Sequence, residues 1–195
     1  MGLLKDCAVT MILLLAVPCF AVHAQNLVSN PDFDTDIKGW TAQGSAAFNW
    51  DGSDGSPSAG SAHFSGSGSA GITGTATSDC FAIPMPAPAT VDLRANVKFA
   101  ASGNAGPSFY ALAFTDGNCT AGGSMIGVSN AFGPPDGNGW RQGQASALLP
   151  IGTNGVQMQL FGQADGSGNL DMHFDHVQFG ASGTVPVILQ TFGVY

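Results

Sequence analysis

The chain has 195 residues, 28 of them Gly, and its 13 acidic residues are all Asp. Five basic residues leave a formal net charge of −8, which excludes a nucleic-acid-binding protein because such proteins need a basic face for phosphates. Only 9% of the residues are charged, so a helical bundle with Glu and Lys on its faces is excluded too. The hydrophobic content of 44% argues against disorder, and composition therefore indicates a Gly-rich all-β domain.

The N-terminus predicts a secretory signal peptide over residues 1–24. Lys5 precedes a short apolar run, residues 11–17, and Val22-His23-Ala24 fits the small-x-small cleavage pattern. The apolar run is shorter than the roughly 20 residues that a membrane-spanning helix needs, and no later segment predicts a transmembrane span. We therefore expect a bacterial protein that is secreted or periplasmic.

Two cysteines, Cys80 and Cys119, follow the predicted signal peptide. An even count in an oxidising compartment predicts one disulfide bond between them, with two buried thiols as the alternative. The length predicts one domain, which we place over residues 25–182, followed by a C-terminal tail or extra strand over residues 183–195.

Short runs with strand character alternate along the chain with turns rich in Gly, Pro, Asn and Asp. In chain order the predicted strands cover residues 46–50, 62–64, 72–76, 91–99, 109–114, 140–149, 156–160 and 170–179. The run at 91–99 is the clearest, because apolar odd positions alternate with polar even positions. Many short strands without an amphipathic helix predict a β-sandwich or a β-barrel.

Two end motifs give the chain a family resemblance. The predicted mature chain opens with Asn26-Leu27-Val28-Ser29-Asn30-Pro31-Asp32-Phe33-Asp34, then Gly39-Trp40, and it closes with Phe174-Asp175-His176-Val177-Gln178-Phe179. This combination resembles the galactose-binding-like jelly rolls, in particular the secreted carbohydrate-binding modules attached to cellulases and xylanases. The resemblance covers residues 26–180 and implies an all-β, two-sheet β-sandwich (a jelly roll) whose first and last strands lie side by side.

The same resemblance implies a structural Ca²⁺ site near those strands. The acidic opening position of the family matches Asp34, the first Asp of its closing pair matches Asp175, and His176 replaces the second Asp. Ca²⁺ takes roughly six to eight oxygen ligands, so backbone carbonyls and Asp51 or Asp54 are expected to complete the set. The alternative is that these carboxylates cap turns or pair with Lys or Arg.

Three polar residues, Asp171, His173 and Asp175, alternate along the last predicted strand and so share one face. His173 and Asp175 are a candidate pair for a transition metal. A third close ligand is not evident in the sequence, where His63 is remote. We therefore interpret these residues as a polar strand face.

A sugar site is the binding site that the composition suits best, because such sites combine aromatic platforms with planar hydrogen-bonding groups. Trp50 is the candidate platform, since it lies beside a Gly-rich loop. Outward-facing positions of two predicted strands supply the hydrogen-bonding side chains. The candidate binding residues are Trp50, Arg94, Asn96, Gln157 and Gln159. The alternatives are core packing for Trp50 and an ordinary solvated sheet face for the polar residues.

We therefore predict a secreted, non-catalytic protein that binds a polysaccharide or another glycan and no nucleic acid. The alternative is a structural or adhesive β-sandwich without a sugar site, in which residues 185–189 pair with a partner chain as an edge strand. An Asp-dependent glycan hydrolase is the least favoured hypothesis. Glycosidases use a pair of carboxylates, and nothing in the sequence selects a pair of Asp residues.

Overall fold

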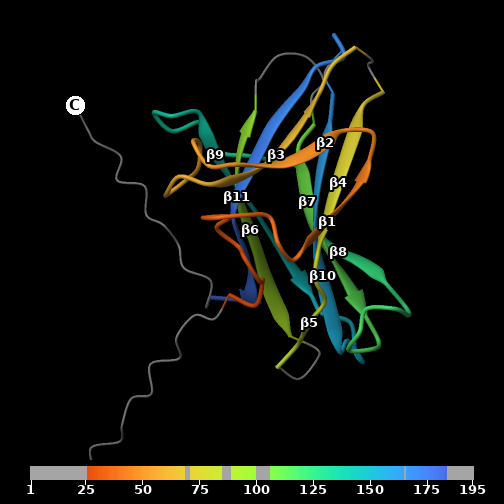
Figure 1. The fold of residues 1–195 in the computed structure, drawn as a ribbon. Coiled ribbons are helices and arrows are strands. Elements are labelled where there is room, and N and C mark those ends of the chain that lie inside the picture. The colour runs from red at the N-terminus through yellow and green to blue at the C-terminus, as the bar shows by residue number, and fades with distance from the viewer. Residues whose placement is uncertain (1–25, 69–70, 85–88, 100–105, 165, 184–195) are drawn as a thin grey trace, which may run out of the picture.

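The computed structural model describes residues 26–68, 71–84, 89–99, 106–164 and 166–183, which form two antiparallel β-sheets and no helix (Figure 1). The predicted signal peptide and residues 184–195 of the predicted tail lie outside these ranges. Within them, no helix is long enough and apolar enough to cross a membrane. The prediction of an all-β, two-sheet β-sandwich is confirmed.

One sheet, which we call the six-stranded sheet, consists of β1 (Trp40–Gly44), β4 (Thr73–Ser78), β5 (Phe81–Ala82), β7 (Ser108–Phe114), β8 (Ser124–Ser129) and β10 (Gly155–Gln163). Its spatial order is β1-β4-β10-β7-β8, with β5 also paired to β10. The other, the five-stranded sheet, consists of β2 (Ala47–Asp51), β3 (Ser61–Gly66), β6 (Thr90–Phe99), β9 (Trp140–Leu148) and β11 (Leu170–Ala181). Its order is β2-β3-β11-β6-β9.

Each strand predicted from the sequence is present, with bounds that differ by a few residues. Strands β1, β5 and β8 are not among the predicted strands. Strand β5 has only two residues, and β1 and β8 are edge strands of the six-stranded sheet that bury few side chains. Without a buried face, an edge strand does not need an alternation of apolar and polar residues.

The hydrophobic core lies between the two sheets. On β6 the apolar odd positions Val91, Leu93, Ala95 and Val97 are at most 1% exposed, as the period of two predicts. In the other sheet, β10 contributes its own alternate positions, Val156, Met158 and Leu160. The polar even positions of β6 therefore lie on the outer face of the five-stranded sheet.

The two ends of the domain meet, but not as the paired first and last strands that the family resemblance implies: β1 lies in the six-stranded sheet, and the N-terminal segment before it lies beside β11. Leu27 N donates to Phe179 O at 3.0 Å, and Val177 N donates to Pro31 O at 2.9 Å. The segment is not itself a strand. Opposite it, the register of β11 shifts between Asp175 and Gln178, so the closing motif bulges toward the opening one.

The predicted disulfide bond between Cys80 and Cys119 is present, with the two Cα atoms 5.8 Å apart. It joins the segment after β4 to the turn after β7. Gly155, the first residue of β10, lies against both sulfur atoms and leaves no room there for a side chain.

Candidate functional site

The loop between β2 and β3, residues 52–60, crosses the outer face of the five-stranded sheet (Figure 1). Asp54 accepts hydrogen bonds from Lys98 Nζ at 2.7 Å and from Trp140 Nε1 at 3.2 Å. Ser56 O accepts one from Asn96 Nδ2 at 2.9 Å. These contacts keep the middle of the face covered, and Trp140 is only 2% exposed beneath the loop.

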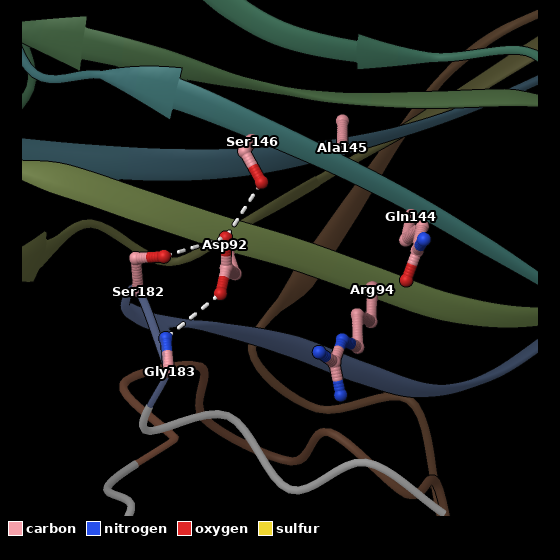
Figure 2. Close-up of a pocket in the computed structure, with 7 residues that line it drawn as sticks. All are labelled: Asp92, Arg94, Gln144, Ala145, Ser146, Ser182 and Gly183. Carbon is pink, nitrogen blue, oxygen red and sulfur yellow. Dashed lines mark hydrogen bonds between the residues drawn. The ribbon is translucent and has the colours of Figure 1, made fainter.

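Beyond this loop the same face opens into a cleft of about 470 Å³ (Figure 2). The residues that line it are Asp92, Arg94, Gln144, Ala145, Ser146, Ser182 and Gly183. Arg94 on β6 and Gln144 on β9 are direct cross-strand partners, as are Asp92 and Ser146. The cleft thus gathers a carboxylate, a guanidinium, an amide and hydroxyls, mostly from the strands themselves.

Asp92 is held in one orientation by three donors. Its carboxylate accepts hydrogen bonds from Ser146 Oγ at 2.7 Å, Ser182 Oγ at 3.3 Å and Gly183 N at 3.0 Å (Figure 2). Burial raises the pKa of Asp92, but the hydrogen bonds outweigh burial and hold the pKa below its usual value. Asp92 is therefore a fixed, ionised acceptor at neutral pH.

The structure does not bring the five candidate binding residues together. Arg94 lines the cleft, although it is only 9% exposed, and Asn96, at 7% exposed, is bonded to the β2–β3 loop instead. Gln157 and Gln159 lie on β10 of the other sheet, where their Nε2 atoms donate to Ser78 O at 3.1 Å and to Thr77 Oγ1 at 3.0 Å.

Trp50 lies on edge strand β2, on the same side of that strand as Phe48, which packs against the core. It is 43% exposed, and its Nε1 donates to Phe33 O at 2.6 Å. Its indole is therefore on the opposite side of the five-stranded sheet from the cleft. Gln144 and Ser146 are not among the binding residues predicted from the sequence. Alternation along β9 puts both on one strand face, but alternation alone does not say which strand lies next to them.

The three residues expected to hold Ca²⁺ have different neighbours. Asp34 is exposed and accepts a hydrogen bond from Ser58 Oγ at 2.9 Å. Asp175 is 0% exposed and accepts from Ser56 N at 2.6 Å and His176 N at 2.7 Å. Burial raises the pKa of Asp175 to about 7, and these two hydrogen bonds offset only part of that rise.

Asp51, the third of them, lies beside two histidines instead. Among the described residues, the set of three possible metal ligands whose donor atoms come within 4.8 Å of one another is Asp51, His63 and His173, and it includes neither Asp34 nor Asp175. The three carboxylates therefore do not fit one shared Ca²⁺ site in this arrangement. Ca²⁺ binding stays a prediction, which the melting temperature in Ca²⁺ and in a chelator would check.

His176, which replaces the second Asp of the family pattern, forms its own contacts. Its Nδ1 lies 2.5 Å from Asp32 Oδ1, and its Nε2 lies 2.7 Å from Gln178 Nε2. The hydrogen bond to Asp32 raises the pKa of His176, against the effect of burial. The replacement thus links the closing motif to the opening one through a histidine–aspartate contact.

No protein-family model matches the chain, and no curated protein does. Solved structures share its fold. The CBM22-2 xylan-binding domain of Xyn10C from Paenibacillus barcinonensis superposes with a TM-score of 0.52 at 16% identity, over 78% of this chain and 98% of that one. TmCBM61, solved in complex with β-1,4-galactotriose, has a TM-score of 0.55 at 11% identity, over 80% and 99%.

A third neighbour is the enzymatically active domain of tailspike protein 4 from bacteriophage CBA120. It has a TM-score of 0.55 at 17% identity and matches 80% of this chain, but this chain spans only 21% of the length of that one. The structural neighbours are thus chiefly carbohydrate-binding modules of the β-sandwich type, and at these identities they establish the fold.

Proposed function

We propose that this protein is exported and binds a neutral glycan in the cleft of the five-stranded sheet, without catalysing a reaction on it. The observation that carries the proposal is the cleft itself. Arg94 and Gln144 lie side by side there, next to the oriented carboxylate of Asp92. Its fold is also that of modules described as binding xylan or solved with galactotriose.

The chemistry of the cleft suits sugar hydroxyls. Each hydroxyl both donates and accepts a hydrogen bond, so it needs an acceptor and a donor at close range. Asp92 supplies the acceptor, and the guanidinium of Arg94 and the amide of Gln144 supply donors in planar geometry. The volume of about 470 Å³ lies within the range of small-ligand sites, about 300–1,000 Å³.

None of the residues that line the cleft is aromatic, so hydrogen bonds rather than ring stacking would carry most of the affinity. The lining also contains a single carboxylate, Asp92, whereas glycoside hydrolysis needs two. The lowered pKa of Asp92 suits an acceptor and not a general acid. These features support binding without hydrolysis. The disulfide bond supports an oxidising compartment outside the cytoplasm.

The test is binding to a panel of soluble and insoluble polysaccharides and to a glycan array, with and without Ca²⁺. We expect Gln144→Ala to weaken binding, because this exposed side chain lines the cleft and contributes little to packing. Arg94→Lys is the second variant, since lysine keeps the charge but loses the planar fork. The matched control is Gln159→Ala on the other sheet, which should bind like the wild type.

Three results would overturn the proposal. Retention on no glycan would favour the structural or adhesive alternative. Loss of binding in Gln159→Ala or Trp50→Ala, with binding intact in Gln144→Ala, would move the site away from the cleft. Hydrolysis of a retained glycan, abolished by Asp92→Asn, would make the protein an enzyme.

A further inference from the structure

Two histidines and an aspartate meet on the outer face of the five-stranded sheet, away from the cleft. His63 on β3 and His173 on β11 are direct cross-strand partners. Their imidazole rings stack with centroids 4.1 Å apart and planes 5° apart. Asp51 ends the neighbouring strand β2, and one donor atom of each of the three residues lies within 4.8 Å of the others.

Polar groups surround this pair of rings on both edges. Asp171 Oδ1 lies 2.8 Å from His63 Nε2 and 3.6 Å from His173 Nε2. On the other edge, Ser61 Oγ lies 3.0 Å from His173 Nδ1, and Asp51 Oδ2 lies 3.9 Å from the same atom. Two imidazoles therefore sit between two carboxylates.

Among the described residues, the basic side chain nearest to this cluster along the strands forms no ion pair with the carboxylates of the cluster. Lys98 is the cross-strand partner of His173, but its ammonium forms a 2.7 Å ion pair with Asp54. Two carboxylates, those of Asp51 and Asp171, lie within 4 Å of the imidazole nitrogens. A dication bound between them would be the largest local charge at the site.

We infer that His63, His173 and Asp51 bind a divalent transition metal ion, for which Zn²⁺ is the probe. Imidazole nitrogen and carboxylate oxygen are the donor types that Zn²⁺ accepts in four-coordinate sites, whereas Ca²⁺ takes oxygen ligands. The inference stands apart from the glycan proposal, because none of these residues lines the cleft.

Binding requires a small local movement. A single ion cannot lie on the lone-pair axes of two parallel rings, so one ring must tilt out of the stack. His63, whose side chain is 24% exposed and contacts the exposed carboxylate of Asp171, can tilt more readily than His173, which is 11% exposed and held by Ser61. Asp171, at 76% exposure, lies at the solvent side and would serve as a further ligand or direct the ion inward.

The histidine–aspartate pair considered from the sequence does not form the site. Asp175 takes part in hydrogen bonds to Ser56 N and His176 N, and the donor cluster does not include it. The other two ligands are Asp51 on β2 and His63 on β3, two strands that the fold brings against β11.

The experiment measures Zn²⁺ binding by isothermal titration calorimetry, together with the visible absorption of Co²⁺ substituted at the same site. We expect one site on the sheet face, with a Co²⁺ spectrum typical of nitrogen and oxygen ligands. His63→Ala should weaken Zn²⁺ binding at least about 100-fold, beyond the roughly 10–100-fold that loss of an outer-shell partner costs. Because His63 is partly exposed, this variant should keep its fold, which its thermal unfolding would verify.

The matched control is His176→Gln. It removes the histidine three positions after His173, which contacts Asp32 instead of the cluster. It should bind Zn²⁺ like the wild type. The inference is overturned if the wild type binds no Zn²⁺, if His63→Ala binds it as tightly as the wild type, or if Ca²⁺ competes for the site at equal concentration. The variant Asp51→Asn tests whether Asp51, rather than Asp171, is a ligand. Wild-type affinity for Zn²⁺ in that variant would remove Asp51 from the ligand set.

Discussion

Asp54 and Lys98 form a 2.7 Å ion pair that joins the β2–β3 loop to the middle of the five-stranded sheet. The polar residues Lys98, Asn96 and Arg94 all lie on the outer face of β6. Lys98 and Asn96 lie beneath the loop, whereas Arg94 lines the cleft. The loop thus determines how much of the polar sheet face can meet a ligand. It leaves the cleft at one end and the histidine pair at the other.

Asp54→Ala should loosen this loop. It removes the ion pair to Lys98 and the hydrogen bond to Trp140 Nε1, and we expect the free energy of unfolding to fall by about 1–2 kcal/mol, because the pair is partly exposed to solvent. Acrylamide should then quench Trp140 fluorescence more strongly, since this residue is 2% exposed in the intact protein.

The control for Asp54→Ala is Lys38→Ala, which breaks the exposed Lys38–Asp36 pair, 3.0 Å long. The Lys38 side chain is 89% exposed, so the change should have no measurable effect on stability and should leave quenching unaltered. Equal quenching in wild type and Asp54→Ala would show that the loop is held by its other contacts.

Gly155→Ala should destabilise the protein by about 1–3 kcal/mol, the usual range for an extra methyl group in a packed site. A Cβ atom at this position would lie 2.6 Å from Asp116 O and 2.9 Å from Cys119 Sγ, and neither atom belongs to a flexible side-chain end. Urea denaturation measures the effect. Gly166→Ala is the matched control, because a Cβ there has open space around it. Similar stabilities of the two variants would contradict the tight packing at Gly155.

Removal of the disulfide by Cys80→Ser with Cys119→Ser should lower the free energy of unfolding by about 2–4 kcal/mol. The two cysteines are 39 residues apart in sequence, so the bond reduces the conformational entropy of the unfolded chain. Urea unfolding of the double variant and of the wild type, with and without reductant, measures the loss. If reduced wild type were as stable as oxidised wild type, the bond would contribute nothing to stability.

Asp92→Asn should change how stability depends on acid pH. The pKa of Asp92 in the folded protein lies below its usual value of 3.8, because hydrogen bonds to the ionised form outweigh burial. The ionised carboxylate therefore stabilises the fold above pH 3.8, and this contribution is lost as pH falls through the lower, folded-state pKa.

The difference in melting temperature between wild type and Asp92→Asn should thus be constant from pH 7 to about pH 5 and shrink below about pH 4. Glycan binding should weaken in the variant across the neutral range as well, since Asn replaces the acceptor that faces the cleft. A difference that grew as pH fell would contradict the lowered pKa of Asp92.

The sequence by itself predicted eight of the eleven described strands and, for β6, which side is buried. The alternation in β6 predicted its core residues, because a β-strand turns successive side chains to opposite faces. The count of cysteines after the predicted signal peptide predicted the Cys80–Cys119 bond, and the end motifs correctly predicted that the two ends of the domain meet. The alternation in β6 and the end motifs are patterns within short segments, and each of the two cysteines has one possible partner.

Only the tertiary structure decided which strands are neighbours and what covers them. Alternation marks an outer face but does not say to which sheet it belongs, and so Gln157 and Arg94 look equivalent in the sequence although they lie on different sheets. His63 meets His173, and Asp92 meets Ser182, across long stretches of chain. These meetings follow from long-range antiparallel pairing, which is set by the packing of the whole sandwich rather than by any one segment.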